Sequence, residues 1–527
     1  MPSEHSVDYL VVGGGPAGLQ TAYFLGRTGR SYLVVESGDF PGTFFTRFPR
    51  HRKLISINKV HTGWDDAELK LRTDWNSLLS EEGAPLFTGY TPRYFPAAED
   101  LVRYLADFAA AHELRVRYGT RIEKITKPDD FVALDQNGNT YRAKRVIMAT
   151  GVSLPYVPDI EGVELAEPYG HVSTVPEDFT SQRVLIVGRG NSAFETADNL
   201  IETAAVIHVA GPGSLRLAWQ THFVGHLRAV NNNFLDTYQL KSQNALLDGR
   251  VLSIRADGDG YLVRVSFARV DEVVKEIRYD RVILATGFRF DASLFAPECR
   301  PELTINDRFP AQTDAWESVN VPGLHFAGTI TQVRDFKKST SGFIHGFRYG
   351  VRALHRILER RDHGVGWPGR ELAPTAEAVG DAVIERVNRS SALWQVFGFL
   401  CDAVLVRPDG SVRYVEEVPV AHLAVAVGRG EFGDVESYLT TTLEYGEDHD
   451  LINPFDISAG RVSQQDTSGL DGRYLHPVVR WFRDGEPVRE HHITENLENE
   501  WDSENVHRAP LREFLRALLE PAAAGRP

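Results

Sequence analysis

The 527-residue sequence contains very little cysteine: Cys299 and Cys401 are its two thiols. They lie far apart and in no Cys-x-x-Cys spacing, so the sequence predicts neither a disulfide framework nor a redox-active thiol pair. The absence of such a pair disfavours a thioredoxin-reductase-like reaction, because two-electron transfer to a disulfide needs vicinal thiols. The pattern is typical of a reducing compartment, and we expect a cytoplasmic protein.

Long apolar runs and excess positive charge are also missing. No run approaches the ~20 apolar residues that cross a bilayer, and the first residues lack the segments of a signal peptide. Arg and Lys together number 57 against 72 Asp and Glu, which gives a net charge of −15. Nucleic acids and anionic membranes attract basic surfaces, so the sequence predicts neither as a partner. We expect small-molecule ligands, with a homo-oligomer left open.

Metal-ligand spacings are likewise absent from the sequence. No histidine has partners at the spacing of a zinc motif, and no nucleophile-elbow or phosphate-loop signature competes for the chemistry. We therefore expect structural histidines and no metal site. The histidines considered are His171, His222, His226, His345, His491 and His492.

A strand, a glycine turn, a helix and a second strand follow one another at the start of the chain. Residues 7–12 form an apolar run, Gly13-Gly-Gly15-Pro-Ala-Gly18 comes next, and small or apolar residues then recur at helical spacing. Residues 32–35 read as the second strand. This order predicts a βαβ unit of the dinucleotide-binding type.

The same order returns in the middle of the chain. Residues 184–187 predict a strand, Gly188-Arg-Gly-Asn-Ser-Ala193 a turn, and residues 205–209 the next strand. Each copy is followed downstream by a strand that ends in Ala-Thr-Gly, at 149–151 and at 285–287. The repeat predicts an α/β fold with two Rossmann-like dinucleotide-binding domains.

The remaining segments divide the chain into four parts. Residues 1–165 and 291–361 are expected to form one discontinuous FAD-binding domain, and residues 166–290 the NAD(P)H-binding domain inserted into it. From residue 362 glycine and proline loosen the chain, and short strands with turn signals follow. Residues 362–527 therefore predict a mixed, mostly β C-terminal appendage.

The first glycine turn predicts the FAD site. Glycines permit a tight turn, and the backbone N–H groups of the following helix can then stabilise a pyrophosphate. Glu36 ends the second strand, where a carboxylate can accept hydrogen bonds from ribose hydroxyls. A chance glycine turn is the alternative, but strand, turn, helix and acid all occur in order. The predicted FAD contacts are Gly13, Gly15, Pro16, Ala17, Gly18, Glu36, Ser37, Phe44, Thr150, Gly151 and Gly328.

The second turn predicts the nicotinamide dinucleotide site and favours NADPH over NADH. No acid follows the strand 205–209, whereas Arg216 lies a few residues beyond it. A carboxylate there would repel a 2′-phosphate, and a guanidinium can bind it. The alternative is a solvated surface arginine. The predicted contacts are Gly188, Gly190, Asn191, Ser192, Arg216 and Thr286.

Taken together, these motifs resemble a known family. The two glycine turns, Ala285-Thr-Gly-Phe288 and Phe326-Ala-Gly328 are similar to those of class B flavoprotein monooxygenases. Three further runs resemble, more narrowly, the FAD-dependent oxidoreductase domain-containing proteins of the endoplasmic-reticulum flavoprotein associated with degradation type. These runs are Phe44–Lys59, Asp74–Leu78 and Leu235–Lys241.

The resemblance implies a function and one catalytic residue. It implies that NADPH reduces FAD and that a C4a-hydroperoxyflavin then oxygenates a small nucleophile, with N-hydroxylation of an amine as the expected reaction. By its place in the family pattern, Asn58 is implied to stabilise the oxygenated flavin; a turn asparagine is the alternative. A flavoprotein that oxidises NADPH without oxygenating, or that serves as a scaffold for a protein partner, stays open as the other function.

The missing acid and Arg216 generate a prediction about cofactor choice. The protein should prefer NADPH, and Arg216→Ala should cost on the order of 1–3 kcal/mol of discrimination if the guanidinium binds the 2′-phosphate. The measurement is kcat/KM with NADPH and with NADH for the protein and the variant. Equal use of both dinucleotides by the unsubstituted protein would contradict it.

Overall fold

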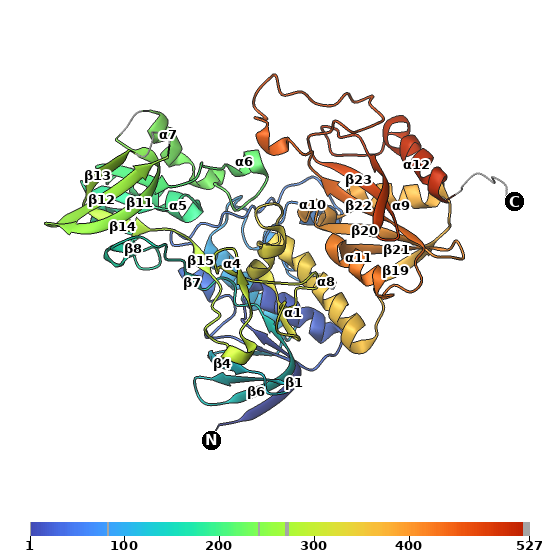
Figure 1. Cartoon of the computed structure of the whole chain (residues 1–527), viewed down its shortest axis with the longest axis horizontal. Helices are drawn as coiled ribbons and strands as arrows, with labels where there is room; N and C mark the ends of the chain where they lie inside the picture. The colour runs from blue at the N-terminus through green and yellow to red at the C-terminus, as the bar shows by residue number, and fades with distance from the viewer. Residues whose placement is uncertain (1, 82–83, 241–242, 269–272, 520–527) are drawn as a thin grey trace.

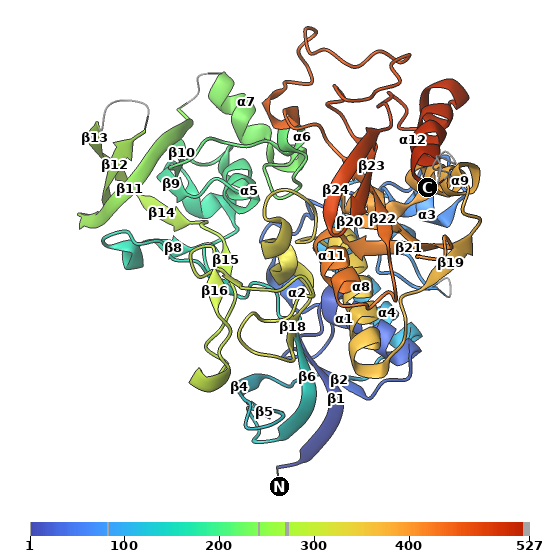
Figure 2. The same ribbon diagram turned by 45° about the vertical axis from the view of Figure 1, so that its right-hand side comes forward.

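The computed structural model describes residues 2–81, 84–240, 243–268 and 273–519; Lys241, which ends one of the runs that carry the family resemblance, lies outside them. The chain forms two α/β domains and a third domain at its C-terminus. In Figure 1 the second domain, in green, lies at the upper left and the C-terminal domain, in orange and red, at the upper right, above the N-terminal part of the first domain, and the turned view in Figure 2 keeps this arrangement. Within the described residues, no helix is long and apolar enough to cross a membrane.

The first domain is built on a seven-stranded sheet in the order β3-β2-β1-β6-β5-β4, with β18 also paired to β6. Its parallel centre is buried because the ends of β1 and β6 are almost entirely apolar. The strands are β1 Glu4–Val12, β2 Tyr32–Val35, β3 Val116–Arg117, β4 Ile122–Thr126, β5 Phe131–Asp135, β6 Thr140–Met148 and β18 Leu324–Phe326. The helices are α1 Pro16–Arg27, α2 Phe44–Arg47, α3 Ala67–Leu71, α4 Ala98–Ala111 and α8 Ile344–His363, with the 3₁₀ helix η6 Gly328–Asp335 before α8.

The second domain repeats this plan around a sheet in the order β13-β12-β11-β10-β9-β14-β8. The strands are β8 Glu167–Pro168, β9 Arg183–Val187, β10 Val206–Gly211, β11 Ala245–Asp257, β12 Gly260–Phe267, β13 Val274–Tyr279 and β14 Arg281–Leu284. The helices are α5 Asn191–Leu200, α6 Ala218–Thr221 and α7 Asn233–Gln239. The predicted fold class, two Rossmann-like domains with a further β-rich region, is confirmed.

Two short ribbons lie where the chain connects these domains. Strand β7 (Leu154–Pro155) pairs antiparallel with β15 (Phe288–Arg289), so the segments that enter and leave the second domain hold one another. Strands β16 (Leu303–Thr304) and β17 (Phe309–Pro310) pair further along. The chain then returns to the first sheet through β18. The long helix α8 begins only at Ile344, because the 3₁₀ helix η6 lies between it and β18.

The C-terminal domain is a six-stranded sheet in the order β19-β21-β20-β22-β23-β24. The strands are β19 Gly369–Leu372, β20 Leu400–Val406, β21 Val412–Pro419, β22 Ser437–Glu444, β23 His476–Arg483 and β24 Glu486–His492. The helices are α9 Ala376–Arg389, α10 Ser391–Gln395, α11 Val420–Gly428 and α12 Ala509–Leu519, with the 3₁₀ helix η7 His449–Leu451 and the π-helix η8 Glu504–Arg508.

This third domain is more than an appendage, because it shares a hydrophobic core with the first. One cluster of buried side chains runs from Tyr9 and Leu354 of the first domain to Leu400, Val415 and Leu423 of the third. Removing the C-terminal domain would therefore expose apolar surface on α8 and its neighbours to water.

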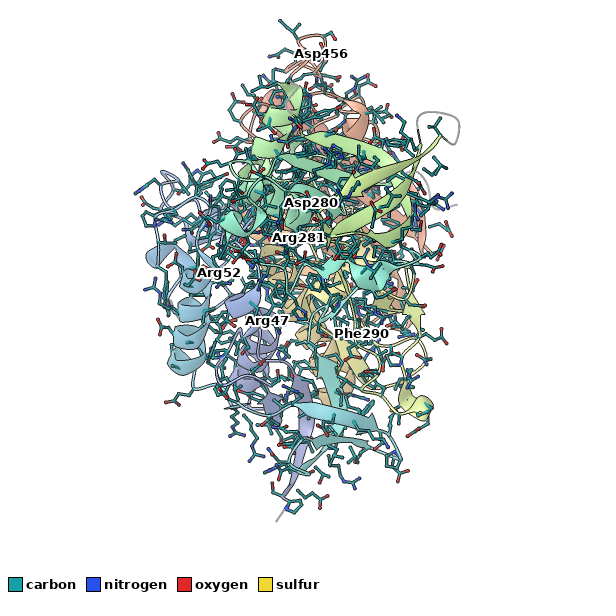
Figure 3. The ribbon with its side chains drawn as sticks, turned by 90° about the vertical axis from the view of Figure 1, so that its left-hand side faces the viewer. Arg47, Arg52, Asp280, Arg281, Phe290 and Asp456 are labelled. Atoms are coloured by element: carbon teal, nitrogen blue, oxygen red, sulfur yellow. The ribbon has the colours of Figure 1, made fainter. Side chains whose placement is uncertain are left out.

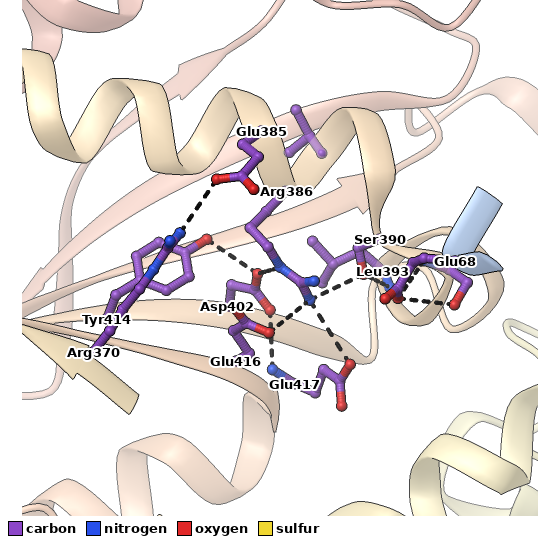
Figure 4. A network of polar contacts seen from close by, with 12 residues as sticks. Glu68, Arg370, Glu385, Arg386, Ser390, Leu393, Asp402, Tyr414, Glu416 and Glu417 are labelled. Atoms are coloured by element: carbon purple, nitrogen blue, oxygen red, sulfur yellow. Dashed lines mark hydrogen bonds and ion pairs between the residues drawn. The ribbon is translucent and has the colours of Figure 1, made fainter. Parts of the chain in front are cut away.

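A buried charge network reinforces the same contact (Figure 4). Asp402 on β20 is fully buried and accepts hydrogen bonds from Arg386 Nε at 2.7 Å, Tyr414 Oη at 3.0 Å and the Glu417 backbone N–H at 3.0 Å. Glu417 in turn pairs with Arg352 and Arg356 of α8. The network thus connects a helix of the first domain to the C-terminal sheet through fully compensated charges.

We predict that Arg386→Met lowers the free energy of unfolding by roughly 3–5 kcal/mol, because Asp402 would keep a buried charge without its cation. Urea unfolding followed by circular dichroism measures the loss. The matched control is Arg407→Met, which removes an exposed ion pair with Glu371 and should change little.

The double variant Arg386→Met, Asp402→Leu should recover part of the lost stability, since it removes both buried charges together. If Arg386→Met and Arg407→Met were equally mild, the network would not be stabilising the domain contact.

Candidate functional site

The first glycine turn places the start of α1 directly against the carboxyl end of the first sheet. Gly13 has a φ of +110°, and a Cβ on it would lie 2.6 Å from the Ala149 carbonyl oxygen. A Cβ on Gly18 would collide with the Gly13 carbonyl oxygen. Both glycines are therefore required by close backbone approach.

Gly15 differs from its neighbours, because a Cβ there would meet no described atom within 4 Å. It is the N-cap of α1, which has Pro16 in its first position and no side-chain cap. The first N–H groups of the helix therefore face open space at the positive end of the helix dipole. Such an arrangement fits a pyrophosphate.

Glu36 lies where a ribose would be expected beside this turn. Its carboxylate accepts hydrogen bonds from the Gly14 N–H at 2.7 Å, the Gly38 N–H at 2.8 Å and Ser37 Oγ at 3.2 Å. It is almost fully buried. These bonds fix the carboxylate but leave it acceptor capacity for hydroxyl groups.

The later parts of the first domain close the same site. Gly328 begins η6 with a φ of +81°, and a Cβ on it would lie 2.6 Å from the Ala17 Cβ. Thr150 follows Ala149, whose N–H donates to the Val12 carbonyl at 2.8 Å, and Gly151 faces open space. The structure therefore brings together predicted FAD contacts from three distant segments. Phe44 lies apart on α2, is 48% exposed and contacts Phe48.

The second glycine turn reproduces this geometry. The Gly188 N–H donates to the Ala210 carbonyl at 2.8 Å, as Gly13 does to Val35, and Gly188 has a φ of +133° against Ala285. Gly190 caps α5 without a side-chain bond and faces open space. A second helix N-terminus is thus available to a dinucleotide.

Three other residues that are predicted to contact the nicotinamide dinucleotide form hydrogen bonds within the protein. Asn191 Nδ2 donates to the Gly225 and His226 carbonyls at 3.2 and 2.9 Å, which holds the loop after α6 against the turn. Thr286 Oγ1 donates to the Tyr156 carbonyl at 2.6 Å. Ser192 accepts a bond through its carbonyl from Thr196 at 2.9 Å.

Arg216 is exposed just beyond the end of β10, and its carbonyl accepts a bond from Leu227 at 3.0 Å. Arg189, inside the glycine turn, was missed by the sequence analysis. Its stem crosses Gly211 at the end of β10, and its guanidinium pairs with Asp248 at 2.6 Å. Arg189 is thus already paired, whereas Arg216 faces solvent where the 2′-phosphate is predicted.

A strap formed by residues 44–58 joins the two dinucleotide-binding domains. Phe48 stacks on Tyr169 with ring centroids 5.8 Å apart and meets Phe288 edge-on at 5.2 Å. Tyr169 also donates a hydrogen bond to Glu195 on α5, and burial raises the pKa of Glu195 to about 7. The family resemblance included this segment within the run Phe44–Lys59, but the sequence did not predict its partners Tyr169 and Phe288.

Asn58 is buried at the end of the strap. Its Nδ2 donates to the Thr91 carbonyl at 2.7 Å and the Arg93 carbonyl at 3.4 Å, whereas its Oδ1 has no partner among the described residues. The side chain therefore presents an acceptor, and its amide hydrogens hold a loop. The catalytic role implied for Asn58 stays a prediction.

Beside Asn58 lies a wall of buried polar side chains. His345, at the start of α8, is fully buried, and neither ring nitrogen has a hydrogen-bond partner in the described chain. It stacks on Trp75 with ring centroids 4.4 Å apart, and the guanidinium of Arg228 from the second domain lies over the Trp75 ring, 5.1 Å from its centroid. Burial, with Arg348 and Arg228 nearby, holds the pKa of His345 well below its usual value.

Buried polar atoms without partners are costly unless a ligand or water satisfies them. Asn58 Oδ1, the His345 nitrogens and Asp335 Oδ1 are of this kind, and they belong to the strap, the start of α8 and the end of η6. Together with the open space at Gly15 and Gly190, they fit a large polar cofactor such as FAD. Spacing along the sequence gave no signal for His345, because its partner Trp75 is far away in the chain.

Comparison with known proteins supports this interpretation of the site. Residues 10–328 match the family model described as pyridine nucleotide-disulphide oxidoreductase. FAD-dependent oxidoreductase domain-containing protein 2 from Mus musculus is 39% identical, over 97% of this chain and 84% of the mouse protein. Ferredoxin–NADP reductase 2 from Exiguobacterium sibiricum is 28% identical, over 63% of this chain and 83% of its own.

Among solved structures, a flavin-containing monooxygenase from Stenotrophomonas maltophilia has a similar fold, with a TM-score of 0.52. It is 21% identical and covers 67% of this chain and 98% of its own. At this identity the likeness concerns the fold alone.

The open space at Gly15 gives a prediction that separates cofactor binding from folding. Gly15→Leu should abolish FAD binding while leaving the fold intact, because a Cβ there meets no described atom within 4 Å and the leucine side chain would extend into the predicted pyrophosphate position. Gly18→Ala, the matched control, should instead lower the free energy of unfolding by about 1–3 kcal/mol through overpacking.

Flavin absorbance per chain and thermal unfolding distinguish the two variants. FAD retained by Gly15→Leu at the level of the unsubstituted protein would show that the pyrophosphate lies elsewhere.

Proposed function

The chain belongs to the pyridine nucleotide-disulphide oxidoreductase family, among the FAD-dependent oxidoreductase domain-containing proteins, and from this premise we propose that it is a monooxygenase of small nucleophiles. It is an FAD-dependent oxidoreductase, and FAD and NADPH are its cofactors. The proposal concerns the acceptor of the electrons: dioxygen, with one oxygen atom delivered to a substrate such as an amine.

The observation that carries the proposal is the state of the two thiols. Cys299 and Cys401 are both buried, lie in different domains and donate to backbone carbonyls of Ile125 and Val418. Burial raises the pKa of both thiols, so neither is a ready thiolate. An internal disulfide therefore cannot take electrons from the flavin, and an external oxidant is required.

The buried wall beside the strap supports dioxygen as that oxidant. Bound FAD would accept a hydride from NADPH and supply the oxygen chemistry. The chain's own part is to hold the two dinucleotides at the N-termini of α1 and α5 and to exclude water with the Phe48, Trp75 and His345 rings. In balance, NADPH, a proton, dioxygen and substrate give NADP⁺, water and the oxygenated product.

A second candidate is NADPH oxidation without oxygenation, and one observation favours it. Both amide hydrogens of Asn58 are directed to backbone carbonyls, so this residue offers no free donor for an oxygenated flavin. In that case electrons reach dioxygen as hydrogen peroxide. The N-hydroxylation proposal depends on which of the two outcomes dominates.

The experiment measures how much oxygenated product and how much hydrogen peroxide form for each NADPH oxidised. With amines and sulfides supplied in turn, a monooxygenase should yield close to one oxygenated product per NADPH, whereas the second candidate should yield about one hydrogen peroxide. NADPH by absorbance, peroxide by a coupled assay and product by chromatography give the ratio. Peroxide alone with every substrate would exclude the monooxygenase.

Asn58→Ala tests the residue implied by the resemblance. If Asn58 supports oxygenation, the amide hydrogen that it gives to the Arg93 carbonyl at 3.4 Å must turn to the flavin. The variant should then keep its FAD and its rate of reduction by NADPH while product gives way to peroxide, since one such donor is typically worth ~3–4 kcal/mol. Asn320→Ala, at an exposed amide remote from the strap, is the control. Loss of FAD in Asn58→Ala would instead assign the residue to holding the loop of Thr91 and Arg93.

A further inference from the structure

We propose that His222, His449 and Asp450 form a zinc site that joins the second domain to the C-terminal domain. One ring nitrogen from each histidine and one carboxylate oxygen all lie within 4.8 Å of one another. The site is separate from the flavin chemistry, and the proposal does not depend on the electron acceptor.

The three residues come from two elements that meet at the far end of the molecule. His222 directly follows α6, and His449 and Asp450 begin η7 after β22. Helix α6 and η7 contact each other, and Figures 1 and 2 show α6 beside the chain that leaves β22. Figure 3 shows Asp456, a little beyond η7, at the end of the molecule opposite the N-terminal strand.

His449 is oriented as a ligand by its backbone partner. Its Nδ1 lies 2.9 Å from the Gly446 carbonyl oxygen, which can only accept, so Nδ1 carries a hydrogen. Its Nε2 then faces the Asp450 carboxylate, with Oδ1 2.8 Å away. A neutral imidazole would present a lone pair to that carboxylate, so a cation, either a proton on Nε2 or a metal, is needed between them. Metal-bound histidines commonly make this backbone bond through the other nitrogen.

His222 supplies the observation that favours a metal. Its Nδ1 is buried and has no hydrogen-bond partner among the described residues. This atom therefore keeps its capacity to bind a ligand. The backbone of His222 lies in the left-handed region, with a φ of +59°, which is uncommon outside glycine.

Tyr445 holds both imidazoles. Its ring stacks on His222 with centroids 4.1 Å apart and on His449 at 4.8 Å, and it packs edge-on against Phe397 of the C-terminal domain. One aromatic ring therefore positions two histidines from different domains. Such support reduces the entropy that ordering the ligands would cost.

Two imidazoles and one carboxylate match the ligands of zinc, which takes four ligands at about 2.0–2.2 Å. The three protein ligands leave one position, which water can fill. The side chains of His449 and Asp450 are 22% and 44% exposed, so they can adjust to tetrahedral separations and the ion can enter from solvent. Imidazole ligands disfavour calcium and magnesium, which prefer oxygen.

A zinc ion at this site would link the second domain to the C-terminal domain. The loop between β10 and α7 carries Arg216 and His222, and Asn191 binds its later part to the second glycine turn. Trp219 and Phe455 make a second contact across the same boundary, with centroids 4.8 Å apart. Bound zinc would therefore fix the loop of the predicted NADPH site against the C-terminal domain.

The test titrates Zn²⁺ into the full-length, FAD-loaded protein after treatment with a chelator. Calorimetry should give one tight site per chain, and Co²⁺ in its place should give the visible absorption of a tetrahedral N/O site. His222→Ala and Asp450→Asn should each weaken Zn²⁺ binding by at least the ~10–100-fold that loss of an outer partner costs. Zn²⁺ should also raise the melting temperature of the unsubstituted protein and not that of the variants.

The matched control is His171→Ala, which removes an exposed histidine of the second domain outside the group and should bind Zn²⁺ unchanged. Asp450→Asn keeps the inference testable should His222→Ala fail to fold, because its side chain is half exposed. The proposal is overturned if the unsubstituted protein binds no equivalent of Zn²⁺, or if both variants bind it as tightly as the control does.

Discussion

The close approach of α1 to the first sheet is the constraint on which the rest of the molecule depends. Gly18 leaves room for the Gly13 carbonyl, and Gly328 leaves room for Ala17, so three segments converge within a few ångströms. Helix α8 packs along α1, and the C-terminal sheet packs on α8 through β21. A larger side chain at Gly18 would therefore push α1 away from the sheet. Because α8 packs on α1 and the C-terminal sheet packs on α8, these contacts would be disturbed as well.

At the junction between the two dinucleotide-binding domains, tightly packed aromatic rings lie near buried polar atoms that have no hydrogen-bond partner among the described residues. Aromatic contacts of Phe48 with Tyr169 and Phe288 fix the strap, while Asn58 and His345 keep buried atoms without partners. A protein retains such atoms where a ligand completes them, since an orphaned buried group otherwise costs about 1–3 kcal/mol. These unpartnered atoms are the ones that a cofactor bound at the proposed site would complete.

The C-terminal domain takes part in this organisation from two directions. Its sheet shares a core with α8 and exchanges charges through Glu417, and its segment after β22 reaches α6 of the second domain. The second domain is therefore held by the β7–β15 ribbon, by the strap and by the chain around Tyr445. The loop between β10 and α7, which carries Arg216 of the predicted NADPH site, also carries His222, which stacks on Tyr445. A ligand that strengthens the contact around Tyr445 would therefore also order this loop.

The sequence by itself determined the local chemistry of this protein. The two glycine turns and Glu36 were predictable because period, turn residues and helix starts are encoded within about thirty residues of one another. The later Ala-Thr-Gly strands were predictable because the same short pattern occurs downstream of each turn. The scarcity of cysteine likewise excluded a thiol pair without any structure. Only the tertiary structure decided that His345 meets Trp75, that Asn58 gives its amide hydrogens to Thr91 and Arg93, and that His222 meets His449. Such contacts join residues that are distant in the chain, and their geometry depends on how whole domains pack, which no local pattern specifies.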